Sequence, residues 1–143
     1  RVNGESNGNV LLRREQYRIA DDQNSSCKIA RAMIFGKLSN SAASIHRTLR
    51  DHRMRVANCG LEEAIQQIRG LLPQVLSVAD MEVLRGLEGV GASAYFAVFD
   101  HQLLNRKDVF FFHRRSRRPP LDRVNAMLSF VPAHWKVSVW IAM

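Results

Sequence analysis

One carboxylate stands among glycines in a segment with helical spacing. Gly86, Gly89 and Gly91 surround Glu88, and each glycine costs about 0.5–1 kcal/mol relative to alanine inside a helix. Close approach of another backbone or of a ligand would offset that cost. Glu88 also falls on the predicted apolar face, so its carboxylate needs a cation, a hydrogen-bond donor or a metal. Spacing alone leaves two alternatives: a structural salt bridge with Arg85 or a later arginine, and a metal-binding or catalytic role.

Four guanidinium groups lie within five residues, directly after an aromatic stretch that includes Phe112. Like charges this close repel unless an anion lies between them, and phosphate is the anion that the guanidinium fork matches. Such contacts would bind nucleic acid without reading its sequence. A solvated loop is the alternative. The predicted DNA-binding residues of this run are Arg114, Arg115, Arg117 and Arg118, and Arg13, Arg14 and Arg85 extend the basic surface.

The histidines do not have the spacing of a metal site. His101 lies thirteen residues after Glu88 on the same predicted helix, which places it about 20 Å away at 1.5 Å per residue. Unless that helix breaks, the two side chains cannot share a metal within one chain. The sequence also contains no recognisable Ser/His/Asp or Cys/His arrangement.

Helical periodicity predicts the elements that position these residues. Apolar residues at steps of three and four begin after Asp21, with an interruption or kink at 39–41, and continue towards Arg55. A further helix is predicted to end at Pro73. Val10–Leu12 is predicted to form at most one short strand, frayed or left over from a missing sheet.

The segment around Glu88 has the strongest helical signal. Ser77 and Asp80 have the spacing of a capping box, and the apolar spacing continues to Leu103. Residues 105–120 are predicted to form a loop, and a short helix follows. The predicted fold class is mainly α, an all-helical bundle.

Size and charge suit a small basic domain. The chain has 143 residues, with 21 Lys and Arg against 13 acidic residues and a net charge of +8. This balance favours nucleic acid as a partner, or less often an anionic membrane surface; a basic protein without an anionic partner is the alternative. The two cysteines have no C-x-x-C spacing, which predicts a reduced, cytoplasmic protein. No signal peptide is visible, and no stretch approaches the ~20 apolar residues of a membrane span, so no membrane association is expected.

Several blocks together resemble a known family. They are 8–17 with 20–22, then 29–31 with 36–40, then 84–89 with 94–96, and finally 117–130. In this order they resemble the CRISPR-associated spacer-acquisition integrase, a prokaryotic metal-dependent DNA endonuclease, and particularly its type I-C branch. The resemblance covers residues 8–130 and is more specific than any single block.

The resemblance implies a fold, an activity and a set of site residues. The fold would be that of the helical C-terminal catalytic domain. Glu88 would be a catalytic ligand of Mg²⁺ or Mn²⁺, which would support cleavage of DNA or attack of a DNA 3′-hydroxyl on a phosphodiester. The family works as dimers bridged by a second small CRISPR-associated protein. Residues of the family motifs with an implied structural role are Asn40, Gly86, Gly89, Tyr95, Pro119, Pro120 and Asn125.

The chain also departs from the family pattern. It starts where the family's β-rich domain should end, and nothing after Phe130 matches the histidine and aspartate that complete the family's metal site. We therefore expect residues 1–19 to be an interdomain linker with a remnant strand, and residues 20–130 to be an incomplete catalytic-type domain. Residues 131–143 have no family character and could come from a shifted reading frame.

Two classes of function follow. The chain is expected to be an incomplete form of the integrase with reduced or no activity. The alternative is a basic helical module without catalysis, which binds nucleic acid or pairs with another protein chain.

Overall fold

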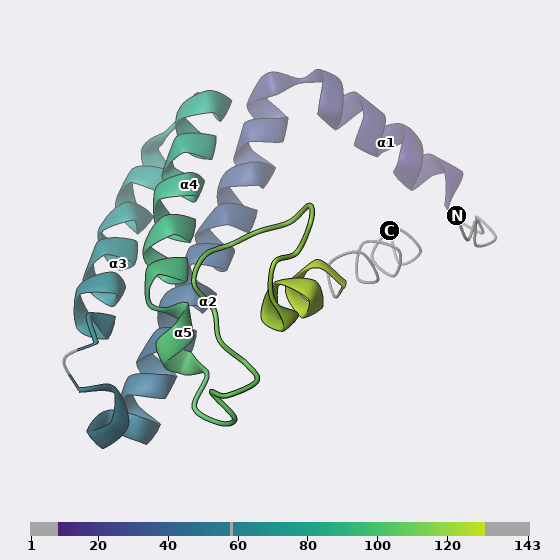
Figure 1. The fold of residues 1–143 in the computed structure, drawn as a ribbon. Coiled ribbons are helices and arrows are strands. Elements are labelled where there is room, and N and C mark those ends of the chain that lie inside the picture. Colours follow the sequence, from purple (N-terminus) through teal and green to yellow (C-terminus); the bar gives the residue numbers. More distant parts are fainter. Residues whose placement is uncertain (1–8, 58, 131–143) are drawn as a thin grey trace.

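The fold is a helical bundle, as predicted. The computed structural model describes residues 9–57 and 59–130, and this part of the chain contains helices and loops but no strand. Three long helices lie side by side (Figure 1). The elements are α1 (Val10–Asp21), α2 (Gln23–Val56), α3 (Leu61–Ser77), α4 (Met81–Ala97) and α5 (Phe99–Gln102), and residues 123–130 are also helical.

The core lies between α2, α3 and α4. Its most buried side chains are Leu38 and Ile45 of α2, Ile68 and Val75 of α3, and Leu84 of α4. Within α2 and within α3 the two residues are seven apart, so they lie on one face of their helix. Each such side chain contributes about 1.5–3 kcal/mol by leaving water. The apolar spacing in the sequence therefore corresponds to the observed core.

Helix α2 is continuous where an interruption at 39–41 was predicted. The Ser41 hydroxyl donates to the Lys37 carbonyl, 2.9 Å away, within the helix itself. Ala42 is buried in the core, so packing holds this turn in place. The only non-helical backbone angles within α2 occur at His52.

The predicted end of α3 at Pro73 is wrong. Pro73 lies inside the helix, which continues to Ser77. Proline removes one backbone donor and normally disrupts a helix. Leu71 and Val75 on either side are buried in the core, and this tertiary packing keeps the last turn helical.

The predicted capping box before α4 is also wrong. Ser77 is the last residue of α3, and its hydroxyl donates to the Gln74 carbonyl. Asp80 alone caps α4, because its carboxylate accepts the backbone N–H groups of Glu82 and Val83 at 2.7 and 3.4 Å.

Helix α4 ends earlier than predicted. It stops at Ala97 instead of continuing to Leu103, because the backbone leaves helical geometry at Val98. Val98 is buried, and the chain turns there to begin the short α5. The break matters for the site, since it turns Phe99 and Asp100 towards the loop that follows.

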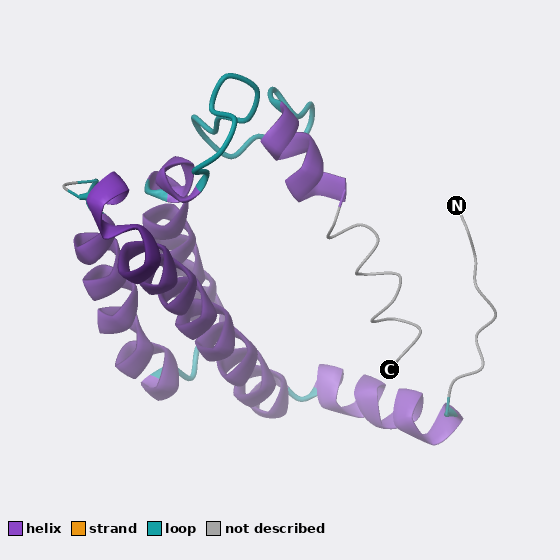
Figure 2. Cartoon of the chain, turned by 90° about the horizontal axis from the view of Figure 1, so that it is seen from below, coloured by secondary structure: helices purple, strands orange, loops and turns teal. Residues whose placement is uncertain are grey.

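The predicted strand at Val10–Leu12 is wrong, since these residues form the first turn of α1. The Asn9 side chain accepts the backbone N–H groups of Leu11 and Leu12, and this cap starts the helix. No residue of α1 is buried, and Figures 1 and 2 show α1 leading away from the bundle. The expectations for residues 1–8 and 131–143 lie outside the described residues. In the described part, no helix is both long and apolar enough to cross a membrane.

Candidate nucleic-acid interface

Glu88 forms an ion pair between two helices of the bundle. Its Oε1 lies 2.5 Å from Nζ of Lys37 on α2, and its side chain is 35% exposed. Arg85, the predicted partner, instead pairs with Glu82 on its own helix. The salt-bridge prediction was therefore right about the type of contact and wrong about the partner. At this exposure the pair contributes at most about 1 kcal/mol to stability.

The described residues do not form a metal centre around Glu88. Residues 9–57 and 59–130 contain no group of three His, Cys, Asp or Glu side chains able to hold an ion. The break at Val98 separates His101 from the helix of Glu88, yet it does not bring the two into such a group. In addition, the Lys37 ammonium forms an ion pair with the Glu88 carboxylate. A divalent cation does not fit these residues alone.

The glycines of α4 differ in their surroundings. A Cβ on Gly91 would lie 2.3 Å from Cδ2 of Leu38, so α2 approaches α4 closely at this residue. No described atom outside the helix lies within 4 Å of a Cβ built on Gly86 or Gly89. The expected neighbour was another backbone or a ligand. At Gly91 the close neighbour is a side chain of α2, no described protein atom approaches Gly86 or Gly89, and the ligand alternative stays a prediction.

The loop that carries the arginines is anchored on α5. The buried Phe112 packs against Phe96 and Phe99, with ring centroids 5.6 and 4.9 Å away. Its backbone N–H donates to Oδ1 of Asp100 at 2.7 Å, and Lys107 pairs with Oδ2 at 2.5 Å. Burial raises the pKa of Asp100, but the hydrogen bonds from Lys107 and Phe112 outweigh it, so this pKa lies below the ordinary value. The loop therefore leaves α5 at a defined point.

A buried amide holds the other end of the loop. Asn125 is fully buried, and its Oδ1 accepts from Arg115 Nη1 at 2.8 Å and from the Ser116 N–H at 2.9 Å. Its Nδ2 donates to the Arg114 carbonyl at 2.8 Å and to Asp122 at 2.6 Å. All the hydrogen-bonding capacity of the amide is used, which explains how a polar side chain is buried here.

Arg115 points into the protein, unlike its neighbours. Besides the Asn125 amide, its guanidinium donates to the Leu128 carbonyl and the Ser129 hydroxyl, both 3.3 Å away. Burial lowers the pKa of Arg115 and the charge of Arg117 lowers it further, although arginine stays protonated at neutral pH. These contacts fasten the helix at 123–130 to the loop, so the geometry gives Arg115 a structural role.

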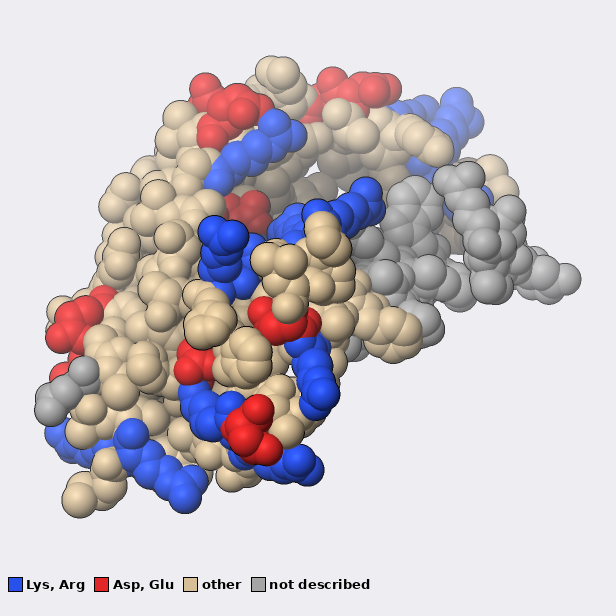
Figure 3. Space-filling model, viewed as in Figure 1, with Lys and Arg blue, Asp and Glu red and all other residues tan. Residues whose placement is uncertain are grey.

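The other three arginines of the run are exposed. Arg114, Arg117 and Arg118 extend from a loop whose backbone is held by the Asn125 amide. The exposed Pro119 and Pro120 follow them, and the Arg118–Pro119 peptide bond is cis. Figure 3 shows basic side chains gathered near the middle of this face, with acidic side chains among them.

The remaining candidates lie elsewhere. Arg13 and Arg14 are exposed on α1, away from the bundle, and Arg85 is held by its Glu82 ion pair. Asn40 is exposed on α2. Tyr95 is partly buried, with its ring 5.4 Å from Phe96 and 5.6 Å from Phe99.

The sequence analysis did not single out two residues that make contacts described above, Lys37 and Asp100. Lys37 pairs with Glu88 across 51 positions of the chain, and no local pattern predicts such a distant contact. Asp100 could have been suspected as a charged residue in an otherwise apolar run, but its partners are set by the turn at Val98.

Comparison with known proteins places this chain in a family. The sequence profile of the CRISPR-associated protein Cas1 family matches residues 1–142. The chain belongs to the Cas1 family. A CRISPR-associated endonuclease Cas1 of Chlorobaculum tepidum is 42% identical over 130 residues, which cover 91% of this chain and 38% of the relative. A Cas1 endonuclease of Leptospira interrogans is 35% identical over 85% of this chain and 48% of its own length.

Some relatives join Cas1 to another protein. A Cas4 exonuclease/Cas1 endonuclease fusion of Myxococcus xanthus is 35% identical over 87% of this chain and 22% of its own length. The chain thus spans less than half the length of each of these three curated relatives. The Cas1 family resemblance found in the sequence is confirmed, while the type I-C branch is not distinguished by these matches.

Proposed function

We propose that this chain is the DNA-binding helical part of a CRISPR-associated endonuclease and integrase of the Cas1 family. The observation that carries the proposal is the loop at 103–122, which is anchored at both ends and presents Arg114, Arg117 and Arg118 to solvent. Anchored arginines lose less conformational entropy on binding an anion than a flexible loop would.

The charge of this loop suits a phosphodiester backbone. Three exposed guanidinium groups close in sequence offer forked donors to phosphate oxygens. Backbone contacts of this kind give affinity without base readout, and they release counterions. We therefore propose DNA of any sequence as the ligand, with Arg13 and Arg14 as further contacts and Arg115 as the residue that holds the loop.

We propose the nuclease and integrase chemistry of the family for a complete metal site that includes Glu88, and not for this chain by itself. Glu88 would serve as one ligand of Mg²⁺ or Mn²⁺ in a site completed by residues beyond those described. Such a cation stabilises charge on the oxygens of a phosphodiester during cleavage or strand transfer. Because the described residues do not hold a metal alone, we propose reduced or no nuclease activity for this chain.

The test combines DNA binding with cleavage. Anisotropy of a labelled branched duplex, measured from about 50 to 200 mM salt, should give a steep salt dependence. The double variant Arg117→Gln/Arg118→Gln should lower the slope by about 2, about one per phosphate contact. The matched control Arg18→Gln/Lys28→Gln removes two exposed basic residues outside the loop and should change the slope little. Equal slopes for both variants would reject the loop as the DNA site.

Cleavage of the same DNA with and without Mn²⁺ tests the catalytic part. No cleavage by the folded chain is expected. Mn²⁺-dependent cleavage that Glu88→Gln abolishes would show that a complete site forms, for example with a second copy.

One observation favours the alternative of pairing with another protein chain. Helix α1 has no buried residue, and its Val10, Leu11 and Tyr17 side chains are each more than 70% exposed. We propose a homodimer or a second small CRISPR-associated protein as the partner, in a prokaryotic cytoplasm. The similarity of residues 8–22 to the type I-C branch also makes that branch our proposal. Sedimentation velocity tests pairing: a monomer at all concentrations would reject self-association.

A further inference from the structure

A second basic surface lies between α2 and α3, and it shares no residue with the arginine loop. Here a cavity of about 510 Å³ is lined by Asn40, Ser44, His46, Arg47, Arg50 and Arg69, with Ala43 as its one apolar lining residue. We call it the α2–α3 groove. An adjoining cavity of about 300 Å³ shares His46 and Arg50 and adds Arg53, Leu49 and Glu62. The groove therefore extends along α2.

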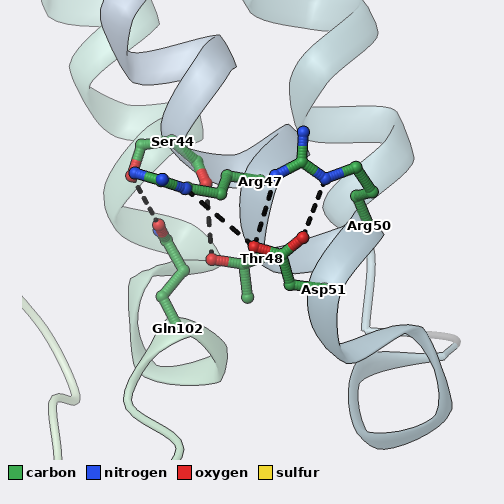
Figure 4. A network of polar contacts seen from close by, with 6 residues as sticks. All are labelled: Ser44, Arg47, Thr48, Arg50, Asp51 and Gln102. Atoms are coloured by element: carbon green, nitrogen blue, oxygen red, sulfur yellow. Dashed lines mark hydrogen bonds and ion pairs between the residues drawn. The ribbon is translucent and has the colours of Figure 1, made fainter.

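The positive charge in this groove exceeds the negative charge beside it. Asp51 accepts from Arg50 at 2.8 and 3.4 Å, and Arg47 Nε lies 3.9 Å from the same carboxylate (Figure 4). Two guanidinium groups thus share one acid. Arg69 forms no ion pair within residues 9–57 and 59–130. The side chains of Arg47 and Arg50 are 79% and 64% exposed, so both retain donors for a ligand.

The lining of the groove distinguishes between two kinds of anionic partner. Protein interfaces usually centre on apolar or aromatic side chains that are removed from water. In the 510 Å³ cavity Ala43 is the single apolar side chain, and the rest are amide, hydroxyl, imidazole and guanidinium groups. Leu49 and Glu62 line only the adjoining cavity. Arg47 and Arg50 also follow one another at about one helical turn, or roughly 5 Å, and Arg53 lies beyond the non-helical backbone at His52. This arrangement suits successive phosphates better than an acidic protein segment.

We infer that the α2–α3 groove is a second phosphate-binding site, which takes the backbone of a nucleic acid through Arg47, Arg50 and Arg69. Asn40 supplies a neutral donor at one end, whereas the Ser44 hydroxyl donates to Oε1 of Gln102 at 3.1 Å. The inference depends neither on the arginine loop nor on Glu88, so it stands or falls separately from the function proposed above.

The double variant Arg47→Gln/Arg69→Gln tests this inference in the full chain. Both side chains are exposed, so the fold should be retained, which far-UV circular dichroism verifies. The salt slope of duplex binding should fall by about 2, roughly one per arginine. Arg18→Gln/Lys28→Gln, which changes neither the groove nor the loop, is the matched control and should leave the slope nearly unchanged. A slope equal to that of the wild type would overturn the inference.

Further measurements distinguish a nucleic-acid backbone from free phosphate as the ligand, and the groove from the loop as the binding site. In the wild type, an oligonucleotide should shift the His46 NMR signals at far lower concentration than inorganic phosphate does. If inorganic phosphate shifts these signals at the same concentration as the oligonucleotide, the groove is a small-anion site and the inference is overturned. If a poly-glutamate peptide binds more tightly than DNA, the inference is overturned in favour of a protein partner. Combining the groove and loop variants should lower the slope by about 4. If only Arg117→Gln/Arg118→Gln lowers the salt slope, the groove is rejected and the loop is kept as a DNA site. If only Arg47→Gln/Arg69→Gln lowers it, the loop is rejected and the groove is kept.

Discussion

The helical bundle and the arginine loop are stabilised in different ways. In the bundle, Leu38, Ile45, Ile68 and Leu84 are almost completely buried and make only apolar contacts with their side chains. The loop and the helix at 123–130 instead depend on hydrogen bonds centred on the buried Asn125. The buried Phe112 adds an aromatic contact of the loop with α4 and α5.

This difference separates stability from positioning. Apolar burial contributes most of the folding free energy but has little directional preference. Hydrogen bonds contribute less on balance, yet they fix direction and distance. The bundle therefore keeps the molecule folded, while the polar network decides which arginines face solvent. The following changes should affect one region and leave the other intact.

The largest effect is expected in the bundle. Leu38→Ala should lower the free energy of unfolding by about 2–5 kcal/mol, because it leaves a cavity between α2 and α4. Met33→Ala on the same helix is the control, since Met33 is 65% exposed and should change stability by less than about 0.5 kcal/mol. Urea unfolding measures both values. Similar losses for the two variants would contradict the assignment of Leu38 to the core.

A smaller and local effect is expected for Asn125→Ala. The change leaves the Ser116 N–H, the Arg114 carbonyl and the Arg115 guanidinium without the amide, and this should destabilise the loop by about 1–3 kcal/mol. Amide hydrogen exchange should become faster at 113–126 and remain slow in α3. Exposed Asn40→Ala serves as the control. Faster exchange throughout α3 would show that the loop and the bundle unfold together.

The anchor of the loop at Asp100 should be sensitive to acid. Its pKa is lowered in the folded state, so its contribution to stability is fully present above the unfolded value of about 3.9. That contribution is lost as pH falls below this value, through the lower folded pKa. The melting temperature of Asp100→Asn should be below that of the wild type at pH 7, and the difference should shrink towards pH 3. A difference independent of pH would contradict a role for the carboxylate charge.

The smallest effects are expected at two glycines of α4. Gly86→Ala should stabilise the chain by about 0.5–1 kcal/mol, because alanine favours the helix and meets no described atom within 4 Å. At Gly91 the same gain is opposed by contact with the buried Leu38, since overpacking costs about 1–3 kcal/mol. Thermal unfolding should rank Gly86→Ala above the wild type and Gly91→Ala below it. A Gly91→Ala variant more stable than the wild type would show that Leu38 moves aside without cost, and a Gly86→Ala variant less stable than the wild type would contradict the open space at Gly86.

Part of the site could be predicted from local sequence. The loop position, its aromatic start and its exposed arginines follow from residues close together in the chain. The inward direction of Arg115 could not be predicted, because it depends on an amide ten residues later. The Lys37 partner of Glu88 comes from another helix, and the groove combines α2 with Arg69 of α3. Long-range packing decides such contacts, and one sequence does not record it.

The sequence by itself determined the mainly helical fold, the apolar helical periodicity of α2, α3 and α4, and the strong positive charge. These properties depend on composition and on a periodicity of three and four residues, which a local reading detects. Tertiary structure decided where helices continue or end. Burial kept α2 intact through 39–41 and α3 intact past Pro73, whereas the packing of Val98 and Phe99 ended α4 early. The physical reason is that burial free energy from distant residues exceeds the local preference of a serine, a proline or an apolar run.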